Sequence, residues 1–126
     1  MKKFFVLFLI FGLFGLIGCT NKYAAYAGTY SLYDAEGQYY LSDFQEYTIV
    51  LSAQGEAEIT AVTSYMEGGQ YQGTHDIYEY RIEDRKIIFW NDQTPEFEQR
   101  YEDGQIIIEN FSYESGTSTL WFRKDS

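Results

Sequence analysis

The chain of 126 residues contains one cysteine, one proline and one histidine, and nine Lys and Arg residues against 19 Asp and Glu. A single cysteine excludes internal disulfide bonds, so the domain must be held by a packed core and hydrogen-bonded strands. His75, without a second histidine or a free cysteine, excludes a zinc site built from the usual ligands. The chain also has no Gly-x-Ser-x-Gly, phosphate-loop or dinucleotide-binding motif. These absences argue against an enzyme and against a metal or cofactor site.

Basic residues are too few for a nucleic-acid-binding protein. Beyond residue 18, seven Lys and Arg stand against all 19 acidic residues, which gives a formal charge of −12. Phosphate backbones and bare anionic lipid repel such a surface. The plainest interpretation is an exported surface kept from aggregating by its charge.

A long apolar run occurs only at the start of the chain. Lys2 and Lys3 precede an uninterrupted apolar and glycine stretch, residues 4–18. This is the layout of a secretory signal. A membrane-spanning helix needs about 20 apolar residues, so the run is short for a permanent anchor. An ordinary signal peptide and an uncleaved membrane helix are the alternatives.

The residues that end this run, Leu16, Ile17, Gly18 and Cys19, resemble the lipobox of bacterial lipoproteins. The resemblance implies signal cleavage between Gly18 and Cys19 and a covalent lipid, with acyl chains such as palmitate, on the Cys19 sulfur. Two or three acyl chains hold a protein firmly on a membrane. The implied location is the outer face of the cytoplasmic membrane, or the outer membrane in a cell with two membranes.

Aromatic residues are abundant in the rest of the chain, and they alternate with polar residues at period 2. This pattern predicts an all-β domain of seven or eight antiparallel strands with little helix. Connection by hairpins favours a small up-and-down barrel, with a flattened barrel or a sandwich as the alternative. Residues 64–74 are expected to form a flexible Gly-rich loop. The expected strands cover residues 28–33, 47–51, 56–63, 75–82, 86–90, 97–102, 105–111 and 116–124, and the connection after residue 33 is a candidate for a further short strand at residues 39–41.

The two ends of this predicted domain resemble those of the calycins, the lipocalin-like barrels. Gly28-Thr29-Tyr30 stands where that family begins its first strand with Gly-x-Trp, and Arg123 ends the last strand. The resemblance implies that Arg123 packs over the Tyr30 ring and that the first and last strands close the barrel. The expected organisation is a signal peptide (1–18), a lipidated N-terminus with a short tether (19–27) and a lipocalin-like barrel (28–124).

Five aromatic residues are predicted to point into the barrel: Tyr47, Tyr78, Tyr80, Phe97 and Tyr101. An eight-stranded barrel is either filled by its own side chains or holds one small ligand. Our first functional hypothesis is that these residues bind a small apolar ligand without catalysing a reaction. The alternative is that the rings only fill the core.

Two segments near the C-terminus, residues 86–90 and 105–110, are apolar on both faces. Ile87 or Ile88, with Trp90 and Ile107, are expected to form an outer patch covered by the tether or by a partner.

The second functional hypothesis is a protein-interaction module at the cell envelope, such as an inhibitor of an exported hydrolase or an envelope-assembly factor. Such a module would use the acidic surface and the loops around Tyr39 and Tyr71.

Overall fold

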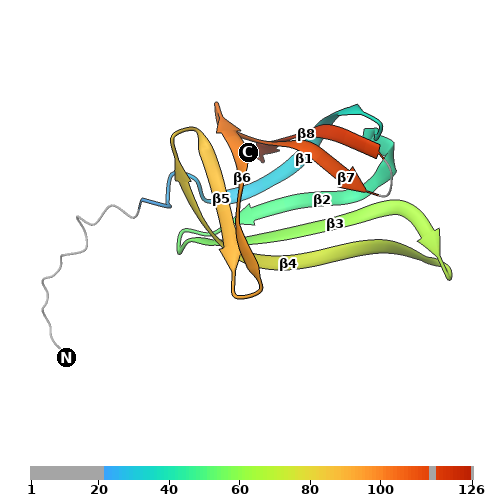
Figure 1. Ribbon diagram of the computed structural model, residues 1–126, viewed down its shortest axis with the longest axis horizontal. Helices are drawn as coiled ribbons and strands as arrows, with labels where there is room; N and C mark the ends of the chain where they lie inside the picture. The colour runs from blue at the N-terminus through green and yellow to red at the C-terminus, as the bar shows by residue number, and fades with distance from the viewer. Residues whose placement is uncertain (1–21, 114–115, 126) are drawn as a thin grey trace, which may run out of the picture.

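The computed structural model describes residues 22–113 and 116–125, which form a closed antiparallel barrel of eight strands. Each strand pairs with its neighbours in sequence, and the first also pairs with the last (Figure 1). The prediction of a small all-β, up-and-down barrel is therefore confirmed. The elements are β1 (Gly28–Gly37), a 3-10 turn η1 (Leu41–Asp43), β2 (Phe44–Leu51), β3 (Glu56–Glu67), β4 (Gln70–Glu83), β5 (Lys86–Asn91), β6 (Thr94–Glu102), β7 (Gln105–Tyr113) and β8 (Gly116–Lys124).

The period-2 pattern decides which side chains enter the barrel, because successive residues of a strand point to opposite faces. On β2, the side chains of Tyr47, Ile49 and Leu51 are buried in the core, whereas Thr48 and Val50 between them are partly exposed. The faces predicted for this strand are thus confirmed. The fully buried large side chains of the core are Tyr30, Tyr80, Phe89, Phe122, Ile49, Leu51, Ile87, Ile106 and Leu120.

Three of the hairpins turn through pairs of left-handed residues, and in two of these pairs at least one residue is not glycine. Asp103 and Gly104 join β6 to β7 with φ angles of 54° and 75°, as the Asp-Gly dipeptide predicts. Asp84 and Arg85 join β4 to β5 with φ angles of 55° and 62°. The second turn has no glycine, so its backbone carries some strain.

Two local predictions were wrong. Residues 64–74, expected to be a flexible loop, lie mostly in β3 and β4, which extend into a long hairpin that turns at Gly68 and Gly69. Residues 39–41, the candidate for a further short strand, instead lead into η1, where the Asp43 carboxylate accepts a hydrogen bond from the Tyr40 backbone N–H (2.7 Å). A local side-chain bond of this kind competes with strand pairing.

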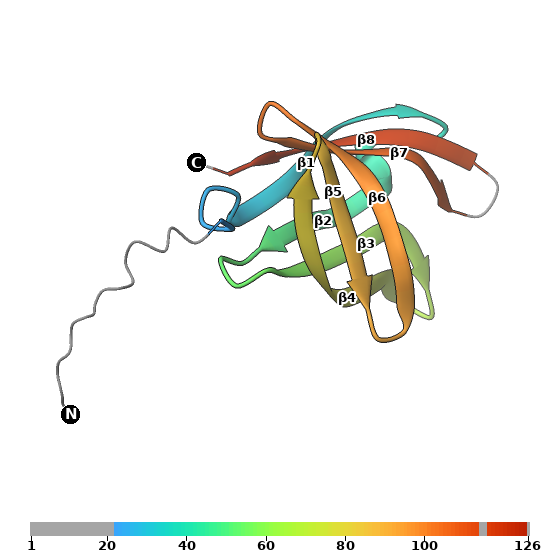
Figure 2. The ribbon, with the colours of Figure 1, turned by 60° about the vertical axis from the view of Figure 1, so that its left-hand side comes forward.

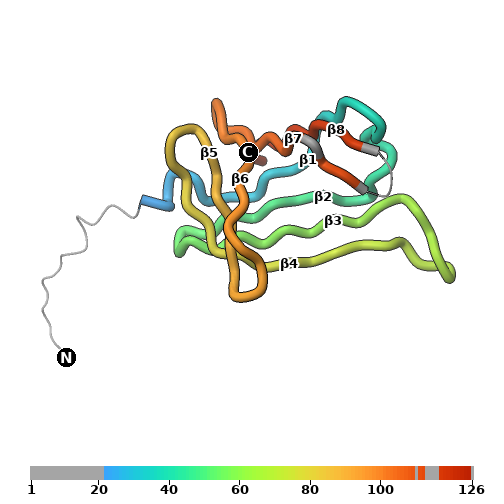
Figure 3. Tube along the Cα trace, viewed as in Figure 1, coloured from blue at the N-terminus to red at the C-terminus, as the bar shows by residue number. Residues whose placement is uncertain are grey.

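The hairpins gather at two ends of the molecule (Figures 1 and 2). At one end, which we call the N-terminal end, residues 22–27 meet the β2–β3, β4–β5 and β6–β7 turns. The opposite end, which we call the far end, is formed by η1 and the β3–β4 turn. Figure 3 shows the same trace as a tube, in which β6 and β7 diverge towards the far end. Their ladder covers only Arg100 to Glu102 on β6.

Candidate functional site

The five aromatic residues predicted to point inwards all lie in or against the core, but they form three separate groups. Tyr47 packs against rings of β7 and β8. The rings of Tyr78 and Phe97 face each other with centres 5.3 Å apart. Tyr80 and Tyr101 lie at the N-terminal end. The structure places all five in or against the core and does not bring them together as one ligand site.

Tyrosines plug the N-terminal end of the barrel. The ring of Tyr23 packs edge-on against Tyr80 (5.2 Å), and that of Tyr26 packs against Tyr101 (5.5 Å). The Tyr30 hydroxyl donates to the Tyr26 carbonyl oxygen (2.7 Å) and pairs with the Tyr101 hydroxyl (3.0 Å). Burial raises the pKa of Tyr80 to about 12 and that of Tyr30 well above its ordinary value. These phenols are therefore neutral at physiological pH.

This plug changes the interpretation of the segment that was expected to be a tether. Residues 22–27 form a compact turn in which the Tyr26 and Ala27 N–H groups donate to the Tyr23 carbonyl oxygen (3.0 and 3.1 Å). The Lys124 ammonium of β8 donates to the Ala25 carbonyl oxygen (3.3 Å). The described part of this segment is thus folded against the barrel.

The first and last strands do close the barrel, although Arg123 has a different aromatic partner from the one expected. Its guanidinium carbon lies 4.5 Å from the centre of the Tyr33 ring, outside the barrel, whereas Tyr30 is fully buried inside. Arg123 pairs with Ser31, and a β-bulge follows between Leu32 and Asp34. The extra residue at the bulge is Tyr33, which remains on the outer face beside Arg123.

Gly28 begins the first strand, which the resemblance to the calycins predicts to close the barrel, and it lies beside Lys124. A Cβ atom at Gly28 would come within 2.7 Å of the Lys124 Cε atom, and the φ angle is +149°. Only glycine takes this conformation readily. The backbone conformation at the start of β1 thus depends on this residue.

The outer isoleucines are covered by charged side chains. Ile88 and Ile107 are 4% and 5% exposed although they lie outside the core, whereas Ile87 points inwards. Ile88 pairs with Arg81 on one side and Glu98 on the other. Aliphatic stems of paired charged residues can cover apolar surface in this way. The strands on either side of Ile88 thus supply side chains that can cover it.

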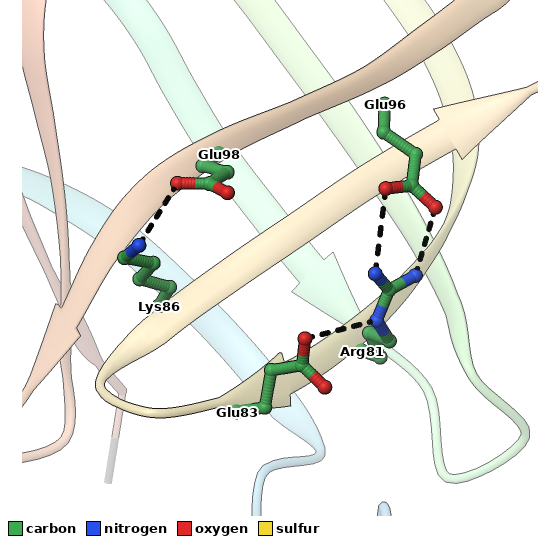
Figure 4. A network of polar contacts seen from close by, with 5 residues as sticks. All are labelled: Arg81, Glu83, Lys86, Glu96 and Glu98. Atoms are coloured by element: carbon green, nitrogen blue, oxygen red, sulfur yellow. Dashed lines mark hydrogen bonds and ion pairs between the residues drawn. The ribbon is translucent and has the colours of Figure 1, made fainter.

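Ion pairs hold these covering side chains in place, as Figure 4 shows. The Arg81 guanidinium contacts Glu96 through two nitrogen atoms (3.0 and 3.3 Å), and Lys86 pairs with Glu98 (3.3 Å). Hydrogen bonding to Arg81 lowers the pKa of Glu96. The Arg81 guanidinium also lies 5.3 Å from the Trp90 ring centre. The outer patch is thus largely closed by this chain itself.

Two hollows are lined entirely by described residues, and both open to solvent. The larger, about 360 Å³, lies at the N-terminal end between the β4–β5 and β6–β7 turns, with Tyr26, Arg85 and Asp103 in its wall. The smaller, about 270 Å³, lies on the outer surface beside Lys86 and Arg100. Neither is an enclosed cavity in the barrel interior.

Large apolar side chains are exposed at the far end. They come from η1 and from the β3–β4 hairpin and are 45–66% exposed. The Ser64 hydroxyl donates to the Ser42 carbonyl oxygen (2.7 Å), which holds the two elements together. We call this surface the rim, and it consists of Tyr40, Leu41, Tyr65, Met66 and Tyr71.

Sequence reasoning found only part of this rim. Tyr71 was assigned to a loop available for interaction, and Tyr39, assigned with it, is half-buried with its ring 5.8 Å from that of Phe111. Leu41, Tyr65 and Met66 were missed. Apolar residues concentrated around Gly68 and Gly69 were the available signal.

The lone histidine pairs with a carboxylate on the outer surface. His75 Nε2 lies 2.5 Å from a Glu58 carboxylate oxygen, and both side chains are about half exposed. Within residues 22–113 and 116–125, no group of three His, Cys, Asp or Glu side chains is arranged to hold a metal ion. The pair is thus an isolated surface contact.

Positive charge is missing from β1, β2, β3 and all of β4 before Arg81. Residues 23–80 contain nine Asp and Glu and no Lys or Arg, whereas residues 81–125 contain six Lys and Arg. The rim and the outer face of β2, β3 and the start of β4 therefore belong to a half of the barrel in which His75 is the sole basic side chain.

The predicted lipidation and cleavage residues, Gly18 and Cys19, lie outside the described residues, as does the predicted signal segment. Among the residues that the structure describes, no helix has the length and apolar character needed to cross a membrane. No protein-family model matches this chain, and neither a curated protein nor a solved structure matches it.

Proposed function

We propose that this chain is a membrane-anchored bacterial lipoprotein whose lipocalin-like barrel is a non-catalytic protein-interaction module at the cell envelope. The rim carries the proposal, because its five large apolar side chains are exposed at one end of the barrel. Soluble domains rarely expose clustered apolar side chains unless a partner covers them. The rim also lies at the opposite end from residues 22–27, so a partner can reach it without disturbing the plug (Figure 1).

Among interaction modules, the shape of the rim favours an inhibitor of an exported hydrolase over an envelope-assembly factor. The β3–β4 hairpin protrudes, and a Cβ atom on Gly68 or Gly69 would meet no atom within 4 Å. A narrow hairpin that stands clear of its own domain fits into the cleft of another protein.

Site-specific photo-crosslinking in the native envelope tests the interaction. A benzophenone side chain at Tyr65 should crosslink one reproducible envelope protein, identified by mass spectrometry. The matched control carries the same group at Asp103, an exposed residue of the N-terminal end, and should not crosslink that protein. Equal crosslinking at both positions, or no specific product at Tyr65, would refute the assignment of the rim.

A small apolar ligand in the barrel is the second candidate function. The favouring observation is that Tyr78 and Phe97 are only partly buried although they face the core. Tyr78 lies on β4 outside its ladder with β5, and Phe97 lies on β6 outside its ladder with β7. Native mass spectrometry of protein purified from its own membranes should then detect a bound species that disappears in Phe97→Ala. Protein that carries no such species argues against ligand binding.

The lipid anchor has its own test. Mass spectrometry of the mature N-terminal peptide should find Cys19 with its sulfur acylated, and globomycin should block this processing. Cys19→Ser should accumulate as an uncleaved precursor. A mature chain that begins at another residue would exclude the anchor.

A further inference from the structure

The strand β4 has a long unpaired edge. It contains 14 residues, and β3 pairs with it from one side between Gln70 and Glu79. On the other side β5 has only six residues and pairs with β4 only between Glu79 and Glu83. No ladder between described residues covers residues 70–78 on that side.

The short β5 ends in a turn made by its own sequence. The Asn91 side-chain oxygen accepts a hydrogen bond from the Gln93 N–H (2.9 Å), which is the local bond that asparagine uses to turn a chain. β5 therefore leaves β4 at this point, and the return strand β6 pairs with β5. Figure 2 shows the end of β4 beside β5, and the β5–β6 hairpin running across the front of the barrel.

The unpaired backbone groups on β4 can be identified from the pairing. Glu83 and Lys86 flank a two-residue turn, so they form a hydrogen-bonded pair and the Glu83 backbone groups point towards β5. Alternate residues back along the strand point the same way, because the pairing with β3 is regular from Glu56 to Val62. Asn91 confirms this direction, since its side-chain amide donates to the Ile77 carbonyl oxygen (3.0 Å). The N–H and C=O groups of Gly73 and His75 and the N–H of Ile77 thus face away from β3.

This edge lacks the features that normally block strand addition. Sheet edges are usually protected by lysine, by proline or by a covering element. Residues 73–77 are all exposed, and residues 70–78 include neither lysine nor proline. By contrast, the free edge of β6 contains Pro95, which has no N–H to donate. The edge of β4 is therefore open to an added strand.

The charge around this edge indicates the occupant. Asp76 and Glu79 lie on β4 itself, and Glu58 lies opposite Ile77 on β3. Residues 23–80 contain no Lys or Arg, and Arg81, the next cation along β4, pairs with Glu83 and Glu96, so His75 is the basic side chain left beside the edge. A second copy of this chain would bring the same negative charge to the edge and be repelled. A strand bearing Lys or Arg would be attracted.

We propose that the β4 edge from Gly73 to Ile77 binds an extended segment of a cationic partner protein, which adds to the sheet as a further strand. Backbone hydrogen bonds would supply affinity, and the side chains at alternate positions would supply selectivity. Ile77, half exposed on the outer face, offers an apolar contact between the flanking carboxylates. This inference rests on the proposed function and specifies that the partner of the interaction module is a cationic protein.

Amide hydrogen exchange followed by NMR tests the edge on the full 126-residue chain in zwitterionic detergent micelles. The probe is an eight-residue blocked peptide of alternating Lys and Val, and the control peptide alternates Glu and Val. The Lys-Val peptide should slow exchange at the amides of Gly73, His75 and Ile77 at least tenfold, and the Glu-Val peptide should not. A Lys-Val peptide N-methylated on the residues that face β4 should have no effect.

Two substitutions at one position separate the backbone from the side chain. His75→Pro removes the outward N–H and should weaken peptide binding at least tenfold, whereas His75→Ala keeps the N–H and should bind the peptide at least as tightly as the original chain. If His75→Pro does not fold, the N-methylated peptide gives the same information on the unaltered protein.

Several outcomes would overturn the inference. They are unchanged exchange at the three amides, equal effects of the two charge types of peptide, and slowing along β7 in place of β4. Slowing that grows with protein concentration without peptide would assign the edge to a second copy. If Tyr65 crosslinks a partner while the β4 amides do not respond, this inference fails alone; if Tyr65 crosslinks nothing, the proposed function fails.

Discussion

Replacing Tyr30 by Phe tests whether the tyrosine plug holds the N-terminal end of the barrel together. The ring remains, so the packing of the fully buried side chain is retained. The lost hydroxyl donates to the Tyr26 carbonyl oxygen at 2.7 Å and pairs with the Tyr101 hydroxyl at 3.0 Å. The substitution therefore removes two hydrogen bonds and leaves two polar groups to find other partners.

The expected loss of stability follows from these two bonds. A hydrogen bond contributes about 1 kcal/mol net, and a buried group left without a partner costs roughly 1–3 kcal/mol. Tyr26 and Tyr101 are only partly buried, so water can reach both orphaned groups. We expect Tyr30→Phe to lower the free energy of unfolding by about 2 kcal/mol, near the middle of this range.

Urea unfolding of the full chain in a mild detergent, followed by tyrosine and tryptophan fluorescence, measures this change. A double-mutant cycle with Tyr101→Phe should give a coupling energy of about 1 kcal/mol, because the two hydroxyls bond to each other. Tyr65→Phe, which removes an exposed hydroxyl, is the matched control and should cost less than about 0.5 kcal/mol. A Tyr30→Phe loss as small as that of the control, or strict additivity with Tyr101→Phe, would refute the plug.

Three further predictions concern other parts of the barrel. The folded-state pKa of Tyr80, about 12, is above its ordinary value of 10, so its contribution to stability should be complete below pH 10 and be lost as the pH rises towards 12; urea midpoints measured from pH 8 to 12 check this. Arg123→Ala removes the cation over the Tyr33 ring and should lower the free energy of unfolding in urea by roughly 0.5–1 kcal/mol. Arg123→Met keeps a long side chain without the charge, so it should lower the free energy of unfolding equally if the charge is responsible. Gly37→Ala should lower the melting temperature much more than Gly68→Ala, because a Cβ at Gly37 would lie 2.6 Å from a backbone oxygen of β8, whereas one at Gly68 would meet nothing; equal shifts would contradict the close approach.

The fold was predictable where one residue type decides a local geometry. Asp103 and Gly104 specify a turn with two left-handed residues, and alternation places Tyr47 and Ile49 inside whatever the neighbouring strands are. Both inferences need only residues close in the sequence. They therefore hold without knowledge of the tertiary structure.

The candidate site was less predictable because it depends on pairing between distant segments. Tyr33 lies at a bulge beside Arg123, and no residue type in the segment marks a bulge. Period 2 places Tyr78 and Tyr80 on the inner face, but whether they meet Phe97 or Tyr101 depends on strand tilt and on where β6 leaves β7. The open edge of β4 likewise arises from the unequal lengths of β4 and β5.

The folded N-terminal segment also gives the proposed lipoprotein a definite orientation. Lys22 already belongs to the turn packed against the barrel, so only three peptide steps separate it from Cys19. Three residues span at most about 11 Å when fully extended, which leaves little freedom for the barrel to turn over. A lipid on Cys19 would therefore hold the N-terminal end against the membrane. The rim, at the opposite end, would point away from the lipid, towards exported proteins, and the absence of Lys and Arg from residues 23–80 would favour those that carry positive charge.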